Sequence, residues 1–211
     1  MKITDLLATS LNRRDDKPNQ ELAVEIIKSK RHDWVKQLVD NLHHKDNNIQ
    51  SDCIKVLYEI GERGAADMIA PYYIDFGQIL KSNNNRLVWG AMTALDMIAL
   101  IDPEGIYGLL PMIMSAVDNG SVITIDHGVG VLSKLASQKK YSDSVFPLLM
   151  EQLKKCPPKQ LPMYAEKAMI AINTRNKYQF INLIETRLSE MEKESQKARL
   201  RKIIKKLNDK K

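Results

Sequence analysis

Two aromatic residues and two carboxylates are the residues of this sequence best suited to binding or to chemistry. Tyr58 and Trp89 occur in successive apolar segments, while Asp96 shares the segment of Trp89 and Asp126 occurs in the next one. Large rigid aromatic side chains are good anchors for a binding partner. An aromatic pair beside carboxylates therefore favours a binding surface.

Helical spacing predicts that these residues share a surface with two hydroxyl groups. Positions i, i+4 and i+7 lie on one face of an α-helix, which groups Trp89 with Thr93 and Asp96. Applied to the neighbouring segments, the same spacing gives the candidate binding residues Tyr58, Trp89, Thr93, Asp96, Asp126 and Ser133. The competing interpretation is that Trp89 packs against a neighbouring segment and that the carboxylates are only solvated.

The sequence lacks the motifs that mark most catalytic and metal sites. It contains no GxxxxGK[ST] or GxGxxG phosphate loop and no GxSxG nucleophile elbow. His43, His44 and Asp46 lie so close together in a polar turn that they converge poorly on one metal ion. Cys53 and Cys156 have no CxxC partner and are typical of small buried residues in a reducing compartment. We therefore expect no catalytic residue, no metal and no cofactor.

Composition favours a helical protein in the cytoplasm. Of the 211 residues, 44% are hydrophobic and 27% are charged, and only 9 glycines and 8 prolines are available for turns. This balance is that of an ordinary folded domain rather than of a disordered chain. No apolar run reaches the roughly 20 residues of a membrane-spanning helix, and the first residues lack the apolar segment of a signal peptide.

The positive charge is concentrated near the end of the chain. Residues 193–211 contain nine Lys or Arg against two acidic residues, a net charge of +7, whereas the whole chain has +6. We expect a basic C-terminal capping helix here, with a basic patch formed by Lys197, Arg199, Arg201, Lys202, Lys205 and Lys206. The outer face of a terminal cap must be polar for solubility; contact with RNA, a ribosome or an anionic membrane is the alternative interpretation.

Two independent markers recur with one period. A small residue four positions before a leucine or isoleucine occurs at Cys53, Ala91, Gly128 and Ala168, at intervals of 38, 37 and 40 residues. Prolines within apolar segments recur at positions 71, 111 and 147, at intervals of 40 and 36 residues. Self-similarity at this period is typical of a helical solenoid, in which each unit buries its apolar face only by stacking on its neighbours.

The repeat predicts about six antiparallel helix pairs in one domain, 1–211. Asn, Asp, Gly and Pro residues interrupt the helical pattern at matching places. Asp102 and Pro103 fit the cap and the first position of a helix. The expected pairs are 2–12 with 18–30, 32–43 with 47–61, 64–81 with 84–101, 103–117 with 121–137, 142–154 with 159–173, and 176–191 with 193–207.

The segment "IAPYYIDFGQILKSNNNRLVWGAMTALDMIAL" resembles a HEAT repeat. Its first helix carries a proline after apolar residues, a polar turn follows, and its second helix has a small residue four positions before a leucine. The resemblance implies an all-α fold, a right-handed α-α superhelix, with a concave surface formed by the second helices. The arginine that HEAT repeats often carry after the turn is replaced by Gln50, Val88, Ile125 and Ala165.

Two functions follow from this resemblance. The first is a scaffold without catalytic activity that binds a protein or peptide partner along the concave second-helix surface. The alternative is a nucleic-acid-directed protein similar to the HEAT-like alkylpurine DNA glycosylases, which use tryptophans and an aspartate; Trp89 and Asp96 are the candidates. Such enzymes hold phosphates with many basic residues, whereas the predicted surface has Lys55 against Asp96 and Asp126.

Overall fold

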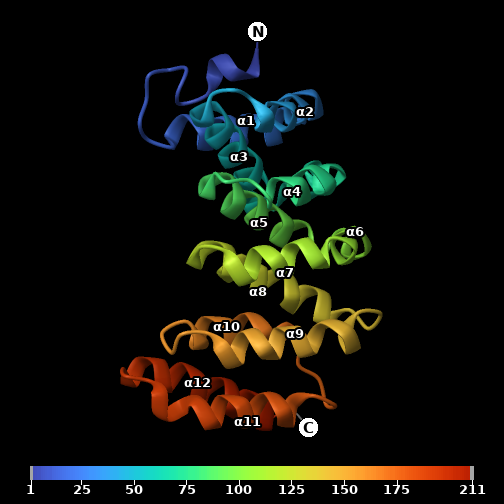
Figure 1. The fold of residues 1–211 in the computed structure, drawn as a ribbon, viewed down its shortest axis with the longest axis vertical. Helices are drawn as coiled ribbons and strands as arrows, with labels where there is room; N and C mark the ends of the chain where they lie inside the picture. Colours follow the sequence, from blue (N-terminus) through green and yellow to red (C-terminus); the bar gives the residue numbers. More distant parts are fainter. Residues whose placement is uncertain (1, 210–211) are drawn as a thin grey trace. The chain divides into compact units, whose positions relative to one another are not determined.

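The computed structural model describes residues 2–209, which contain twelve α-helices and no β-strand. The chain divides into two compact units, residues 1–128 (unit 1) and residues 129–211 (unit 2), and one helix continues across the division (Figure 1). No helix in the described part of the chain is both long enough and apolar enough to cross a membrane.

Unit 1 consists of stacked helix pairs in which α3 and α5 lie side by side. Its helices are α1 (Lys17–Ser29), α2 (His32–Asp40), α3 (Asn47–Ile60), α4 (Tyr73–Ile79), α5 (Asn85–Ile98), α6 (Pro103–Gly108), α7 (Leu110–Asn119) and the first part of α8 (Val122–Ser137). Helix α3 also packs against α1, and α5 against α4, so each second helix is covered by neighbours on several sides.

Unit 2 continues the same helix-pair pattern. After the remainder of α8 it contains α9 (Ser142–Lys155), α10 (Leu161–Ala168), α11 (Lys177–Arg187) and α12 (Glu194–Asn208). Helix α10 packs against α9 and α12, and α11 packs against α12. The helix predicted for the basic segment 193–211 corresponds to α12, and residues 210 and 211 of that segment lie outside the described residues; its role as a cap stays a prediction.

Polar residues in the turns start the second helices as predicted. The side-chain oxygen of Asp46 accepts a hydrogen bond from the backbone N–H of Asn48, and that of Asn84 accepts one from Arg86, at 2.8 and 3.0 Å. Asp102 caps α6 through the N–H of Gly105 at 2.9 Å. Each cap satisfies a backbone donor that the first helical turn would otherwise leave unpaired.

The small residues of the repeat lie where neighbouring helices approach closely. Cys53 and Ala91 are fully buried, as are the leucines four positions after them. At Gly128 a methyl group would lie 2.2 Å from Cγ2 of Val117, much closer than a van der Waals contact. The small side chains therefore permit the packing distance, and the leucines fill the space between the helices.

Three predicted first helices differ from the structure. The prediction of a helix over 2–12 is wrong: only Ile3–Leu6 forms a short 3-10 helix, and a loop follows it. In the 64–81 segment, α4 begins only at Tyr73, because Gly64 has a left-handed φ of 87° and Pro71 lacks the N–H that a continuous helix needs. Pro111 similarly divides the 103–117 segment into α6 and α7.

Candidate binding surfaces

Tyr58 and Trp89 form a ring pair on the neighbouring second helices α3 and α5. Their ring centroids are 5.4 Å apart and their planes are inclined by 52°. The ring of Trp89 is partly exposed, whereas Tyr58 is buried with 5% of its surface accessible. The tilted arrangement is one that aromatic pairs favour, so the pair forms a rigid platform that presents the indole at the surface.

A chain of charged groups lies beside this platform. The ammonium group of Lys55 lies 4.7 Å from the centre of the Tyr58 ring and 2.7 Å from Oε1 of Glu59. Arg63 contacts the other oxygen of Glu59 at 3.1 Å, and Asp16 lies 3.7 Å from Lys55. Burial opposes the charge on Lys55, but the hydrogen bonds to Glu59 and Tyr58 prevail and raise the pKa of Lys55.

Glu62 adds a carboxylate to the same end of α3. Partial burial and the nearby Glu59 carboxylate raise the pKa of Glu62, while His127 and Lys55 act in the opposite direction. This carboxyl group therefore holds its proton more tightly than a free glutamic acid does, and a positively charged ligand beside it would favour its ionised form.

Asp96 is buried and contacts a histidine rather than the solvent. It is 4% exposed, and its Oδ2 lies 2.9 Å from Nδ1 of His127, whose side chain is 22% exposed. Asp126 is partly buried on α8, one residue before that histidine. We call the face formed by the ring pair, the Lys55 chain of charges, Glu62 and His127 the second-helix surface of unit 1.

Four of the six predicted binding residues are buried: Tyr58, Thr93, Asp96 and Ser133. Thr93 and Ser133 are each 1% exposed, and their hydroxyl groups donate to the backbone carbonyls of Trp89 and Val129, at 2.9 and 2.7 Å. These two hydroxyl groups are therefore not presented to the solvent, and their part in binding stays a prediction. Each hydroxyl group thus makes its hydrogen bond within its own helix. Ser133 also lies in unit 2.

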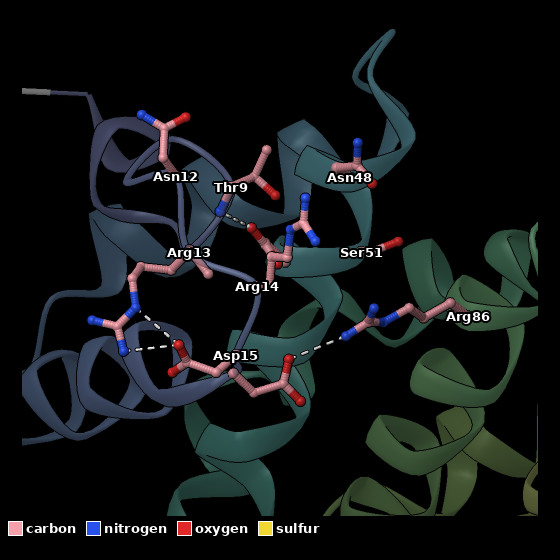
Figure 2. Close-up of a pocket in the computed structure, with 11 residues that line it drawn as sticks. Thr9, Asn12, Arg13, Arg14, Asp15, Asn48, Ser51 and Arg86 are labelled. Carbon is pink, nitrogen blue, oxygen red and sulfur yellow. Dashed lines mark hydrogen bonds and ion pairs between the residues drawn. The ribbon is translucent and has the colours of Figure 1, made fainter.

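A depression of about 550 Å³ lies between the 8–16 loop, the start of α3 and Arg86 (Figure 2). Arg13 pairs with Asp15 at 2.8 Å, and Arg86 pairs with Asp16 at 3.1 Å. Figure 2 shows the guanidinium of Arg14 pointing toward the start of α3. Because Asp16 also lies beside Lys55, the depression adjoins the second-helix surface.

Hydrogen bonds that no sequence pattern indicated hold one wall of this depression. Asn19 is fully buried; its Oδ1 accepts from the N–H of Ala8, and its Nδ2 donates to Asp52 at 2.8 Å. Asp52 also accepts from the N–H of Thr9 at 2.7 Å. These bonds fix an irregular segment that the repeat pattern suggested to be a helix. In the charged network beside the ring pair, the i, i+4 spacings of Lys55 with Glu59 and of Glu59 with Arg63 were visible in the sequence.

The basic patch of α12 is partly neutralised within unit 2. Arg199 forms a two-pronged pair with Glu166 of α10, with contacts of 2.8 and 2.6 Å, and this pair lowers the pKa of Glu166. Lys197 and Arg201 lie near Glu194, at 3.0 and 3.5 Å. The remaining patch residues are exposed on the outer side of the helix: Lys202, Lys205 and Lys206.

The described residues contain no group of three or more His, Cys, Asp or Glu side chains that could hold a metal ion. In the polar turn before α3, Nδ1 of His44 accepts the backbone N–H of Asp46 at 3.0 Å, and the carboxylate of Asp46 caps the helix. This turn therefore has a structural role.

No known protein family and no curated protein matches the sequence. Among solved structures, an engineered protein from the Northeast Structural Genomics Consortium aligns with a TM-score of 0.66 and 16% identity over 99% of this chain and 96% of its own. A computationally designed armadillo repeat protein for modular peptide recognition aligns with a TM-score of 0.67 and 12% identity, covering 88% of this chain and 85% of its own.

A third structure, a designed armadillo repeat protein in complex with the peptide (KR)4, has the same TM-score of 0.67, 14% identity, and coverage of 88% and 85%. These likenesses define the class of the fold. The chain is an all-helical repeat solenoid, as the 36–40-residue period predicted.

Proposed function

We propose that this chain is a non-catalytic repeat scaffold whose second-helix surface of unit 1 binds an extended, basic peptide segment of a partner protein. The observation that carries this proposal is the Tyr58–Trp89 platform, because it combines a partly exposed indole with a fixed ring geometry. Aromatic anchors that are already ordered lose little conformational entropy on binding.

Charge supports a basic ligand. Residues 1–128 contain 13 Lys or Arg and 18 Asp or Glu, a net charge of −5. The pKa of Glu62, just after α3, is raised by partial burial and by the Glu59 carboxylate, and a cationic side chain beside Glu62 would relieve this repulsion. The designed neighbour in complex with (KR)4 supports the same ligand class for a fold of this kind.

We further propose the HEAT-like subtype within the solenoid class. HEAT units have two helices and armadillo units three. Pairs α2 with α3, α4 with α5, and α11 with α12 follow the two-helix plan. The described residues depart from this plan at α1, which only the 3-10 helix Ile3–Leu6 precedes, and at the short α6 before α7 and α8, where Pro111 interrupts a first helix.

Titration with a (KR)4 octapeptide tests the binding proposal. The chain has two tryptophans, so in a Trp34→Phe background the intrinsic fluorescence reports on Trp89 alone. We expect this emission to change on peptide addition, and Trp89→Ala to weaken binding measured by anisotropy at least tenfold. Trp34→Phe alone is the control, because Trp34 lies on α2 against the guanidinium of Arg31 and is not a member of the Tyr58–Trp89 pair.

Two results would contradict the proposal. If the peptide bound wild type and Trp89→Ala with equal affinity, and circular dichroism verified the fold, the platform would not take part in binding. Release of 7-methylguanine from alkylated DNA by wild type, lost in Asp96→Asn, would instead support the glycosylase alternative.

A further inference from the structure

The two units carry opposite net charges. Residues 129–211 contain 19 Lys or Arg against 8 Asp or Glu, a net charge of +11, in contrast to −5 for residues 1–128. The excess is not confined to the last helix, because residues 129–192 already contribute +4. Unit 2 therefore has far too few carboxylates to neutralise its own cations, and it attracts polyanions.

The apolar side of α12 is buried against other helices, so only its charged side is accessible to a binding partner. Leu200, Ile203 and Leu207 are buried within unit 2, and α12 packs against α10 and α11. Insertion of this helix into a bilayer would expose that core, whereas an electrostatic contact leaves it intact. On the outer side, Lys205 and Lys206 make no ion pair with any residue in the described range 2–209.

An exposed aromatic residue lies at the same end of the α11–α12 hairpin. Tyr178 is 73% exposed at the start of α11, and the ammonium group of Lys177 lies 5.4 Å from its ring centre. Helices α11 and α12 pack against each other and run in opposite directions (Figure 1). Tyr178 is in the first turn of α11 and Lys205 and Lys206 are in the last turn of α12, so they lie at the same end of the hairpin. A tyrosine this exposed contributes little to the core and is free to stack on a planar ligand.

Unit 2 also contains a depression of about 560 Å³, and some of its lining residues come just before Tyr178 in the sequence. Its lining includes Lys139, Arg175 and the side chains of Asn173 and Thr174, just before α11. Across residues 2–209, neither Lys139 nor Arg175 has an ion-pair partner. We name the set Lys139, Arg175, Tyr178, Lys202, Lys205 and Lys206 the basic end of unit 2.

We propose that the basic end of unit 2 binds single-stranded nucleic acid. The lysines and Arg175 contact backbone phosphates, and Tyr178 stacks on a base. Unpaired cations combined with an exposed aromatic ring are the two elements of sequence-tolerant single-strand binding. Insertion into a membrane would require a free apolar face, which α12 lacks; an acidic protein would give no reason for the exposed ring.

Anisotropy with fluorescein-labelled U20 RNA and dT20 DNA tests the phosphate contacts. We expect binding by the full chain at 50 mM NaCl that weakens steeply with salt. Each lost contact with a single strand reduces the log–log salt slope by about 0.7. The triple variant Lys202→Gln, Lys205→Gln, Lys206→Gln should therefore reduce the slope by about 2.

The matched control changes the same number of exposed lysines in unit 1: Lys28→Gln, Lys45→Gln and Lys81→Gln. It removes the same total charge and should leave the salt slope unchanged. Equal losses in the two triple variants would overturn the proposal, because they would show that overall charge rather than the basic end governs binding.

The aromatic contact has its own test. Tyr178→Ala should weaken U20 binding about tenfold, since one base stacked on an aromatic residue contributes about 1–3 kcal/mol, whereas Tyr178→Phe keeps the ring and should bind as wild type does. A 20-base-pair duplex, whose bases are already stacked, should be insensitive to Tyr178→Ala. The proposal is overturned if U20 does not bind at 50 mM NaCl, or if the chain sediments with 30% phosphatidylserine vesicles but fails to bind U20.

Discussion

The Nδ1 atom of His127 lies 2.9 Å from Oδ2 of Asp96, although 31 residues separate the two in sequence. The contact joins α8 to α5, so it connects successive repeats of unit 1 at the edge of the second-helix surface. Asp96 is 4% exposed, and a buried carboxylate that loses its partner is costly because its desolvation is no longer compensated.

A double-mutant cycle measures the energy of this contact. We expect Asp96→Asn and His127→Gln each to lower the free energy of unfolding in urea by about 1–3 kcal/mol. The double variant should lose less than the sum of the two, by about 0.5–3 kcal/mol, because the residues are in direct contact. The exposed Asp67→Asn serves as a control that should change stability little. Strict additivity would show that the two side chains do not interact.

The affinity for a basic peptide should rise with pH through the titration of Glu62. The pKa of Glu62 in the free protein is raised above its ordinary value of 4.5 by partial burial and by Glu59. A cationic peptide favours the ionised form, so binding lowers this pKa and releases a proton. By linkage, affinity then increases as the pH rises through the raised pKa.

Titration of (KR)4 between pH 4 and pH 7.5 checks this dependence. Glu62→Gln should reduce the rise of affinity with pH over this range and weaken binding at pH 7. Glu104→Gln on α6 is a control with the same charge change. A wild-type affinity that falls with increasing pH would contradict the predicted sign.

The repeat and the helix starts could be read from the sequence because local chemistry determines them. Asp102 followed by Pro103 begins α6 as predicted, since a cap and a missing N–H act within one turn. The small residue and the leucine of the first three units are buried as the period indicated, whereas Ile172 of the fourth unit is half-buried and lies after α10. These features depend on residues fewer than five positions apart.

The candidate surface was only partly predictable because its side chains contact residues that are far away in the sequence. Helical spacing placed Asp96 on a face, but could not show that His127 would cover it. Thr93 fits the same spacing, yet its hydroxyl donates to the carbonyl four residues earlier and is buried. The loop that Asn19 and Asp52 hold is fixed by a contact across 33 residues, which no local pattern reveals.

Cys53 should be inert to thiol reagents in the native protein. It is fully buried, and burial raises its pKa to about 12. At pH 8 only about one molecule in ten thousand would then carry the reactive thiolate. Ellman's reagent should therefore modify Cys53 at pH 8 only after urea unfolds the chain, and a Cys156→Ser variant isolates its signal. Modification within seconds under native conditions would show that α3 opens readily.

Arg187 should be among the most important single side chains for the stability of unit 2. It is 8% exposed, and its guanidinium donates to the carbonyl of Leu153 at 2.7 Å and to that of Cys156 at 2.9 Å, near the end of α9. Glu190 accepts from the same group and raises the pKa of Arg187. One planar cation thus satisfies two carbonyl groups that the helix end leaves without intrahelical partners.

Replacing this arginine by lysine tests whether the planar fork is required. A lysine keeps the charge but cannot donate to both carbonyls in the same geometry, so Arg187→Lys should lower the free energy of unfolding by about 2–4 kcal/mol. Arg175→Lys makes the same substitution at an exposed position of unit 2 and should change it by less than about 0.5 kcal/mol. Urea unfolding followed by circular dichroism gives both values, and equal stability of the two variants would mean that charge alone holds the end of α9.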